Sequence, residues 1–407
     1  MKTTMQLNDV KKTYFRLVNQ GSFQSIYPKM KYDTSRHKFT FGMDVQFNKR
    51  LSLDIGALIS SKNVSYLYLG VNFKYIRWAA FNVFANAYLG AFYQSVLLRA
   101  KIDFPYDFNF SFEPEMVINS WNYFRNYQFS FGAQPPQYVN QIDKKFGLNI
   151  GFPFGFKKGK ANLFGGYIFN QDIYTDVDKN IGPSDVPDLT IFEGLKLKAS
   201  FIINTLDRKQ YAKKGNYLGL SAVYINGHEH YTPGTTAENN TGIFQRQWYR
   251  LKLTHEKYFT FKFFSFGYLM EGVYSNQPFF SNYRSTMLSA PSFTPLQDGK
   301  TYFMINLRSM SYTAGGMRLS FALYKNLDLR MEGYIFNPLN QIIETDNQKA
   351  AYSGNFWNYQ IIAGASLIYH TGFGPLAFVT NYYPNSFQQW GVFVHFGYIL
   401  FNPKSLE

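Results

Sequence analysis

The stretch SYLYLGVNFKY, residues 65–75, alternates between two kinds of side chain at every step. One set is apolar and the other is polar, small or aromatic with a hydroxyl, so an extended chain here has two different faces. A strand of this kind belongs to a sheet whose two sides meet different surroundings. The apolar set is Leu67, Leu69, Val71, Phe73 and Tyr75, and it alternates with Tyr66, Tyr68, Gly70, Asn72 and Lys74.

The same alternation recurs from about residue 51 to the end of the chain, for example over residues 95–104, 195–201 and 317–323. A soluble sandwich would alternate as well, so the pattern alone does not prove a membrane sheet. The strands run to about 10 to 13 residues, which suits tilted spans of a bilayer. Helical periodicity is almost missing, so no helical layer is expected to cover the apolar face. These features predict an all-β chain.

The composition agrees with a sheet that faces lipid. Aromatic residues make up 20% of the chain and charged residues only 16%, as expected for a lipid-facing wall with aromatic girdles at its rims. Mean hydropathy is −0.26, and no run reaches the roughly 18 apolar residues of a membrane-spanning helix. A sheet in lipid must close on itself to pair every backbone group. We therefore predict a transmembrane antiparallel β-barrel.

Strand counting gives sixteen or seventeen spans, and closure with both chain ends on one side favours sixteen. Connections alternate between short turns, such as 156–159, 257–261 and 325–326, and long loops, such as 172–192, 227–244, 276–312 and 338–356. The barrel is expected over residues 49–407. Residues 1–48 are expected to be a remnant of a periplasmic domain with its linker, and residues 1–17 do not resemble a signal peptide.

The net charge of +15 is spread along the chain, and its longest basic clusters are pairs in turns. Nucleic-acid binding would call for longer Lys/Arg clusters, so it is not expected. Basic residues on the wall and rims instead suit the phosphates of lipopolysaccharide or anionic lipid. The chain has no cysteine, which excludes disulfides, thiol nucleophiles and cysteine-based zinc sites.

Two segments resemble the barrel-assembly and two-partner-secretion superfamily of outer-membrane proteins, also called bacterial surface antigens. The first is the turn and strand NTLDRKQYAKKGNYL at 204–218, with Asp207, Arg208 and Gly215 at the motif positions. The second is the C-terminal region FGPLAF at 373–378 with WGVFVHFGYILF at 390–401. The resemblance implies a last hairpin and a C-terminal targeting strand carrying Phe396, Tyr398 and Phe401.

More narrowly, YFRL at 14–17, IYP at 26–28, GFPFG at 151–155 and the 204–218 segment resemble the barrel half of Bacteroidota patatin-like outer-membrane proteins. The resemblance implies a sixteen-stranded barrel that follows a patatin lipase domain and a small periplasmic transport-associated domain. The lipase half is absent from this chain. The resemblance covers nearly all of the sequence, although each motif is short.

The superfamily resemblance also points to the sixth outer loop, which in those proteins folds back into the lumen. Its Arg-Gly-aromatic motif is matched by LRSMSY at 307–312 and the following glycines, with Ser309 where the family has Gly. The lumen-loop residues are Arg308, Tyr312, Gly315 and Gly316. Asp328 and Glu332 are expected to face inward from the strand at 327–336, so we expect Arg308 to bond one of them. The alternative is a solvated Arg308.

No catalytic motif is found. The Gly-x-Ser triplets ending at Ser184, Ser221 and Ser366 lack the second glycine of a nucleophile elbow, and Asp298-Gly299 is a common turn dipeptide. The cluster at 228–230, His-Glu-His, is expected in an outer loop and lacks a third separated metal ligand. No metal or cofactor is expected. Whether the full-length protein is a patatin-like phospholipase stays open.

Three functions follow from these observations. The first is an outer-membrane anchor that holds, and helps to export, a patatin-like phospholipase domain. The second is a stand-alone pore, although the loop at 276–312 is long enough to plug the lumen. The third is a barrel-assembly protein, which needs a weak seam, and the long apolar final strand expected at 391–401 gives no sign of one. Expected partners are outer-membrane lipids, lipopolysaccharide and the barrel-assembly machinery, with a homodimer left open.

Overall fold

A computed structural model describes residues 6–20, 23–35, 37–47, 49–77, 79–104, 110–123, 139–154, 159–175, 185–235, 237, 241–355, 358–383 and 389–407. The predicted turn at 156–159 and the end of the motif at 151–155 lie largely outside these residues. None of the helices within the described ranges is long and apolar enough to cross a membrane.

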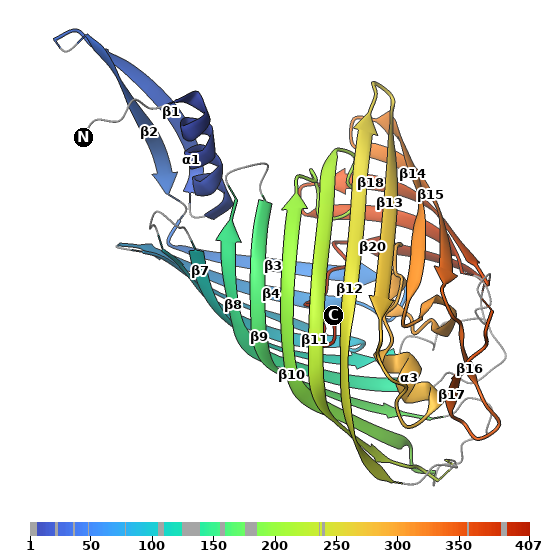
Figure 1. Cartoon of the computed structure of the whole chain (residues 1–407). Helices are drawn as coiled ribbons and strands as arrows, with labels where there is room; N and C mark the ends of the chain where they lie inside the picture. The colour runs from blue at the N-terminus through green and yellow to red at the C-terminus, as the bar shows by residue number, and fades with distance from the viewer. Residues whose placement is uncertain are drawn as a thin grey trace.

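Sixteen strands of the described chain form one closed antiparallel barrel, which confirms the predicted fold class and strand number (Figure 1). Each strand pairs with its neighbours in chain order, and the barrel closes where β20 meets β3. The strands are β3 (Leu51–Ser60), β4 (Tyr66–Ile76), β5 (Ala80–Gly90), β6 (Tyr93–Phe104), β7 (Phe110–Asn122), β8 (Val139–Pro153), β9 (Gly159–Tyr174), β10 (Asp188–Asn204), β11 (Gly215–Thr232), β12 (Gly242–Thr260), β13 (Phe264–Ser275), β14 (Tyr312–Tyr324), β15 (Leu327–Pro338), β18 (Gln360–Thr371), β19 (Gly374–Tyr382) and β20 (Trp390–Phe396).

The alternation in the sequence separates an outer apolar face from an inner polar face. In β4 the side chains of Leu67, Val71 and Phe73 are exposed on the outer wall. In β15 Met331 and Ile335 point outward in the same way, and the alternate residues Glu332 and Tyr334 are buried inside the barrel. The predicted orientation of these strands is confirmed. The outer belt has no protein partner among the described residues, and lipid is the surrounding that suits it.

Five of the described strands are longer than predicted, and the first of them, β8, has 15 residues. β9, β10, β11 and β12 have 16, 17, 18 and 19 residues, and neighbouring register pairs continue almost to their ends. The expected loops at 172–192 and 227–244 are therefore shorter, at 175–187 and 233–241. The cluster His228, Glu229 and His230 lies within β11 and not in an outer loop, because the ladder with β10 and β12 extends past the polar residues.

The smaller elements are not part of the barrel wall. α1 (Leu7–Gln20) and the hairpin of β1 (Phe23–Asp33) and β2 (Lys38–Phe47) precede the barrel and stand beside one rim, where α1 contacts β8 (Figure 1). The loop between β13 and β14 holds α3 (Tyr283–Ser289) and two short 3-10 helices, η2 (Gly299–Thr301) and η3 (Ile305–Leu307). The loop between β15 and β18 holds the hairpin of β16 (Ile342–Glu344) and β17 (Ala350–Tyr352).

Candidate functional site: the barrel lumen and the strand seam

The seam that closes the barrel is much shorter than the other strand pairings. β20 and β3 share two register pairs, His395 with Ser60 and Phe396 with Ile59. A backbone bond from the Ser61 N–H to the Val394 carbonyl, at 2.9 Å, adds to this contact. By comparison, β11 and β12 share seventeen register pairs. The barrel is therefore closed at this point by a small part of each strand.

Most of β3 presents an open edge. Its residues 51–58 pair with β4 on one side, and within the described chain no strand pairs with them on the other side. Leu53 and Ile55 on this strand are 66% and 78% exposed. An unpaired strand edge carries free N–H and C=O groups and is a template for another strand. The expectation that the final strand shows no frayed seam is therefore wrong.

The cause is a turn at Gly397 that ends β20 early. Gly397 has a φ of +101°, and a Cβ atom there would lie 2.1 Å from the Ala57 carbonyl oxygen. Only glycine adopts this conformation without strain at such a close approach. The strand expected to reach Phe401 thus ends at Phe396, and Tyr398 and Phe401 lie beyond it.

Residues 397–407, here called the tail, run inside the barrel along its inner wall. Figure 1 shows the C-terminus within the ring of strands. Phe401 packs between Tyr93 and Trp121, with both ring-centroid distances at 4.9 Å. The apolar character of Phe401 therefore serves packing in the lumen and not contact with lipid.

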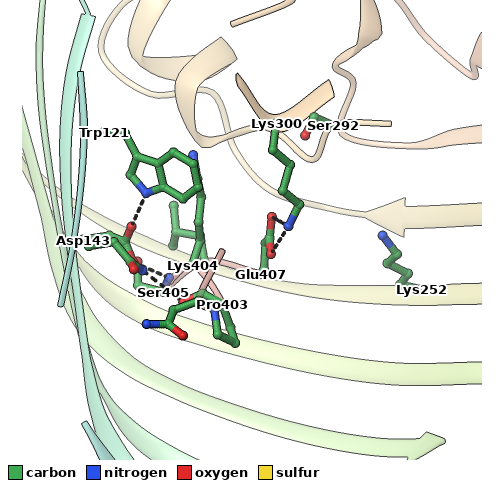
Figure 2. Close-up of polar contacts among 12 residues, drawn as sticks. Trp121, Asp143, Lys252, Ser292, Lys300, Pro403, Lys404, Ser405 and Glu407 are labelled. Atoms are coloured by element: carbon green, nitrogen blue, oxygen red, sulfur yellow. Dashed lines mark hydrogen bonds and ion pairs between the residues drawn. The ribbon is translucent and has the colours of Figure 1, made fainter. Parts of the chain in front are cut away.

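Polar groups from many strands hold the tail. The Tyr66 hydroxyl in β4 donates to the carbonyls of Tyr398 and Leu400. Further along, Asp143 in β8 accepts from the Ser405 N–H at 2.8 Å and from the Trp121 indole at 3.3 Å (Figure 2). Further contacts with the tail are Gln210 of the 205–214 turn with Ile399, Asn86, Tyr93 and Ser95 with Asn402, Asn119 with Pro403, Tyr123 and Gln141 with Lys404, Lys196 with Ser405 and Glu407, and Arg250 with Leu406.

The loop at 276–311, here called the plug loop, also lies in the lumen. Asn282 caps α3 and donates to the Tyr174 hydroxyl in β9 at 2.8 Å. Asp298 accepts from Asn381 in β19 at 2.6 Å and pairs with Lys62, in the β3–β4 connection, at 2.9 Å. The loop therefore reaches wall positions on widely separated strands. Its apolar residues Phe293 and Leu307 are buried against the inner wall.

Arg308 does not make the predicted bond with Glu332 or Asp328. Its guanidinium donates to the carbonyls of Met287, Leu288 and Ala290 at 3.0 to 3.2 Å. Carbonyls at the end of a helix lack intrahelical partners, and Arg308 satisfies three of them at the C-terminal end of α3. The prediction is wrong because the plug loop folds upon itself, and the nearest free acceptors to Arg308 lie within the loop. The solvated alternative is wrong as well.

Glu332 is bonded instead by two arginines, Arg318 and Arg330, whose pairing with it the sequence does not predict. The Arg330 Nε donates to Glu332 at 2.5 Å, and the Arg318 Nε lies 3.4 Å from its other carboxylate oxygen. Arg318 also pairs with Glu256 in β12. All of these side chains face inward. Arg318 and Glu332 are register partners across the β14–β15 hairpin. Counting back from the turn at 325–326 would pair Arg318 with Gly333, because the ladder shifts by one residue between Ala322 and Tyr324.

Asp328 contacts residues of the motif at 204–218. Lys213 donates to Asp328 at 2.9 Å, Arg208 lies 3.6 Å from it, and His370 contacts it at 2.8 Å. Asp207 organises the turn itself by accepting the N–H groups of Lys213 and Lys214.

Gly215 ends this turn with a φ of +100°, and a Cβ atom there would lie 2.2 Å from the Thr205 carbonyl oxygen. The turn at 205–214 therefore docks into the mouth of the barrel. It also contacts the end of the seam, since the Tyr211 hydroxyl bonds the His395 imidazole at 2.9 Å.

The other lumen-loop residues lie at the start of β14. The Tyr312 hydroxyl donates to Glu271 at 2.7 Å and bonds the Ser292 carbonyl, which ties the plug loop to β13. Gly315 and Gly316 follow in the strand, and a Cβ atom at Gly316 would lie 2.1 Å from the Gly333 carbonyl oxygen. Glycine there permits the close approach of β14 and β15.

A search of the described residues finds no group of three or more potential metal ligands. In β11 the Glu229 carboxylate pairs with Arg246 at 2.8 Å, and His230 lies 3.8 Å from Glu193. Ser221 and Ser366 lie in barrel strands, and Ser184 lies outside the described residues. These side chains therefore have roles in the wall.

Known proteins resemble this chain in fold and not in sequence. No protein-family model matches the sequence, and no curated protein matches it. Among solved structures, BamA from Haemophilus ducreyi lacking POTRA domains 1-3 is similar with a TM-score of 0.56 and 11% identity, over 97% of this chain and 79% of that one. CdiB from Acinetobacter baumannii is similar with a TM-score of 0.53 and 10% identity, over 93% of this chain and 66% of that one. CdiB from Escherichia coli is similar with a TM-score of 0.53 and 11% identity, over 95% of this chain and 70% of that one.

At 10 to 11% identity these likenesses show the fold alone, a β-barrel similar to those of BamA and CdiB. The chain is an outer-membrane β-barrel, as predicted.

Proposed function

We propose that this barrel acts in the assembly or translocation of other polypeptides at the outer membrane, and that it does so by opening between β3 and β20. The observation that carries the proposal is the seam of two register pairs beside an open β3 edge. The likeness to BamA and CdiB barrels supports the same kind of role.

The physical argument rests on backbone hydrogen bonds. In lipid an unpaired N–H or C=O group costs several kcal/mol, so strands separate only where few bonds are lost. Two register pairs are the least costly place to open this barrel. An incoming strand would then satisfy the edge groups of residues 51–58 by strand addition.

The filled lumen favours passage of a polypeptide sideways through the seam and not along the barrel axis. The plug loop and the tail both fill the interior, and they contact each other through Lys300 and Glu407. Passage along the barrel axis would have to displace both segments, whereas seam opening leaves the plug loop in place.

A disulfide across the seam tests the proposal. The chain has no cysteine, so Ile59→Cys with Phe396→Cys gives a single pair on register partners. The protein is reconstituted in liposomes, and the folding of a urea-unfolded outer-membrane barrel is followed by heat-dependent gel mobility. We expect the reduced variant to accelerate folding several-fold over empty liposomes. The oxidised variant should lose the acceleration and recover it with reductant.

The matched control places the same crosslink where no opening is expected. Ile55→Cys with Leu69→Cys joins register partners on β3 and β4, both on the outer wall. Its oxidation should leave folding unchanged. An oxidised seam variant as fast as the reduced one, or a wild-type protein no faster than empty liposomes, would contradict the proposal.

A second candidate is the anchor function, in which the barrel holds a patatin-like phospholipase domain of a longer protein and residues 1–48 belong to a periplasmic transport-associated domain. The filled lumen favours it, because an anchor has no need of a channel. The helix and hairpin beside the rim suit such a connection. The anchor does not need the seam to open. Phospholipase activity of the full-length protein that survives seam oxidation would support the anchor, and its loss would contradict it.

A further inference from the structure

A cavity of about 400 Å³ lies inside the barrel, between the inner wall of β10–β13, the plug loop and the tail. Its lining is rich in cations. Six cationic side chains and two carboxylates line it: Lys198, Arg250, Lys252, Lys300, Arg308 and Lys404 with Glu271 and Glu407. The excess of positive charge is gathered from the wall, the loop and the tail, so it surrounds the space on several sides.

Some of these cations are engaged by the tail or the plug loop. Lys300 donates to both carboxylate oxygens of Glu407 at 3.0 Å (Figure 2). Arg250 donates to the Leu406 carbonyl, and Lys404 donates to Gln141 at 3.0 Å. These contacts fix the tail and would explain part of the charge without any ligand.

Two wall lysines are not explained in this way. Lys198 has no hydrogen-bond or ion-pair partner within the described part of the chain, although it lines the cavity. Lys252 pairs with Glu271 at 3.0 Å and does not bond the tail. Neither lysine donates a hydrogen bond to the tail among the described residues, although both interact with the Glu407 carboxylate at longer range. A partly buried cation without a partner costs free energy unless an anion or water compensates it.

The cavity is electrostatically positive even at the tail. Burial alone would raise the pKa of the Glu407 carboxyl, but the charges of Lys300, Lys404 and Lys252 outweigh burial and hold this pKa well below its usual range. The Glu407 carboxylate therefore lies in a positive field, and the six cations that line the cavity outnumber its two carboxylates.

The cavity also has solvent access and donors suited to oxygen-rich anions. The side chains of Lys252 and Lys300 are 41% and 39% exposed. The hydroxyls of Ser200, Ser221 and Ser292 line the same space. A phosphate group offers several charged oxygens in different directions, so cations and hydroxyls that converge from three parts of the fold suit it.

We propose that this cavity is a binding site for a phosphate-bearing anion, with Lys198 and Lys252 as the wall cations that contact it. The source of the phosphate is either a soluble molecule or the headgroup of a lipid such as lipopolysaccharide.

Inorganic pyrophosphate is the soluble probe, and its affinity for the detergent-solubilised full chain is measured by calorimetry. Lys198→Gln and Lys252→Gln should each weaken binding at least about tenfold, the effect of losing one charge-assisted bond. Lys257→Gln is the matched control, because Lys257 lies on β12 at a position of opposite parity to Lys252 and outside the cavity. It should bind as the wild type does. Heat-dependent gel mobility checks that each variant is folded.

Lipopolysaccharide micelles form the second arm, with the same variants. Pyrophosphate binding that depends on Lys198 and Lys252 supports the site with a soluble source. Binding only of lipopolysaccharide, with the same dependence, supports the site with a lipid source. The proposal is overturned if neither probe binds, or if binding is unchanged when both lysines are replaced.

Discussion

The Lys300 side chain, in the plug loop, donates to both carboxylate oxygens of Glu407, in the tail, at 3.0 Å. The two residues lie far apart in the sequence and come from the two segments that fill the barrel. Their contact makes the plug loop and the tail one interior unit. Because the tail begins where β20 ends, this unit is also connected to the seam.

Replacing Lys300 by Gln should loosen the tail. A charge-assisted hydrogen bond contributes roughly 1.5 to 3 kcal/mol, so its loss should raise tail exposure at least about tenfold. Ser405 is fully buried, and Ser405→Cys supplies a single thiol in a chain without cysteine. We expect a maleimide to label S405C slowly and S405C with K300Q about ten times faster. S405C with K257Q should match S405C, and equal rates in all three proteins would refute the role of Lys300.

The same contact should make stability depend on pH. The pKa of Glu407 is lowered in the folded protein, since the nearby lysines outweigh burial. A carboxyl group with a lowered pKa stabilises the folded state at pH values above the ordinary carboxyl pKa of about 4.3. This stabilisation is lost as the pH falls below that value. The wild-type protein should unfold at a higher temperature than Glu407→Gln at pH 7, with a smaller difference at pH 3. A difference that grows on acidification would contradict this assignment.

The filled lumen predicts electrical silence. In planar bilayers the wild-type chain should show no steady conductance, because the plug loop and the tail occupy the interior. Replacing residues 278–309 by a short Gly-Ser linker should give long-lived openings, provided that the variant keeps its heat-dependent gel mobility. Steady openings of the wild-type protein would mean that the lumen conducts with both segments in place, and would favour a pore.

The buried arginines should be coupled to Glu332. Removing one partner of a buried pair leaves an uncompensated charge and typically costs about 3 to 5 kcal/mol. In a double-mutant cycle, Arg318→Met and Glu332→Gln should be strongly non-additive in unfolding free energy. Arg308→Met should be additive with Glu332→Gln, because Arg308 bonds carbonyls of the plug loop. Non-additivity of that second pair would restore the original prediction for Arg308.

The sequence predicts the features of this fold that depend on neighbouring residues. Alternation over residues such as Leu195 to Leu197 reveals which side chains meet lipid, because a strand repeats every two residues. The inward direction of Asp328 and Glu332 follows from the same rule. Which face a side chain lies on is determined by the sequence of a single strand.

The partners of those inward residues depend on contacts that sequence patterns do not encode. Arg308 was assigned to the wall because the way in which the plug loop folds cannot be read from alternation. The resemblance places Phe401 on the final strand, and its aromatic ring does not contradict this, because such a ring packs equally well against Trp121 and against acyl chains. The short seam is not evident from the sequence either, because the apolar residues continue past the end of β20. Gly397 marks the turn that ends the strand.

The most direct test of the central claim, that the barrel opens between β3 and β20, is backbone hydrogen exchange in lipid nanodiscs. Amides open to exchange where few hydrogen bonds must break. We predict that amides of β20 and of residues 51–58 exchange at least about ten times faster than those of β11 and β12, whose pairing is extensive. Equal protection of the seam and of β11–β12 would contradict the claim.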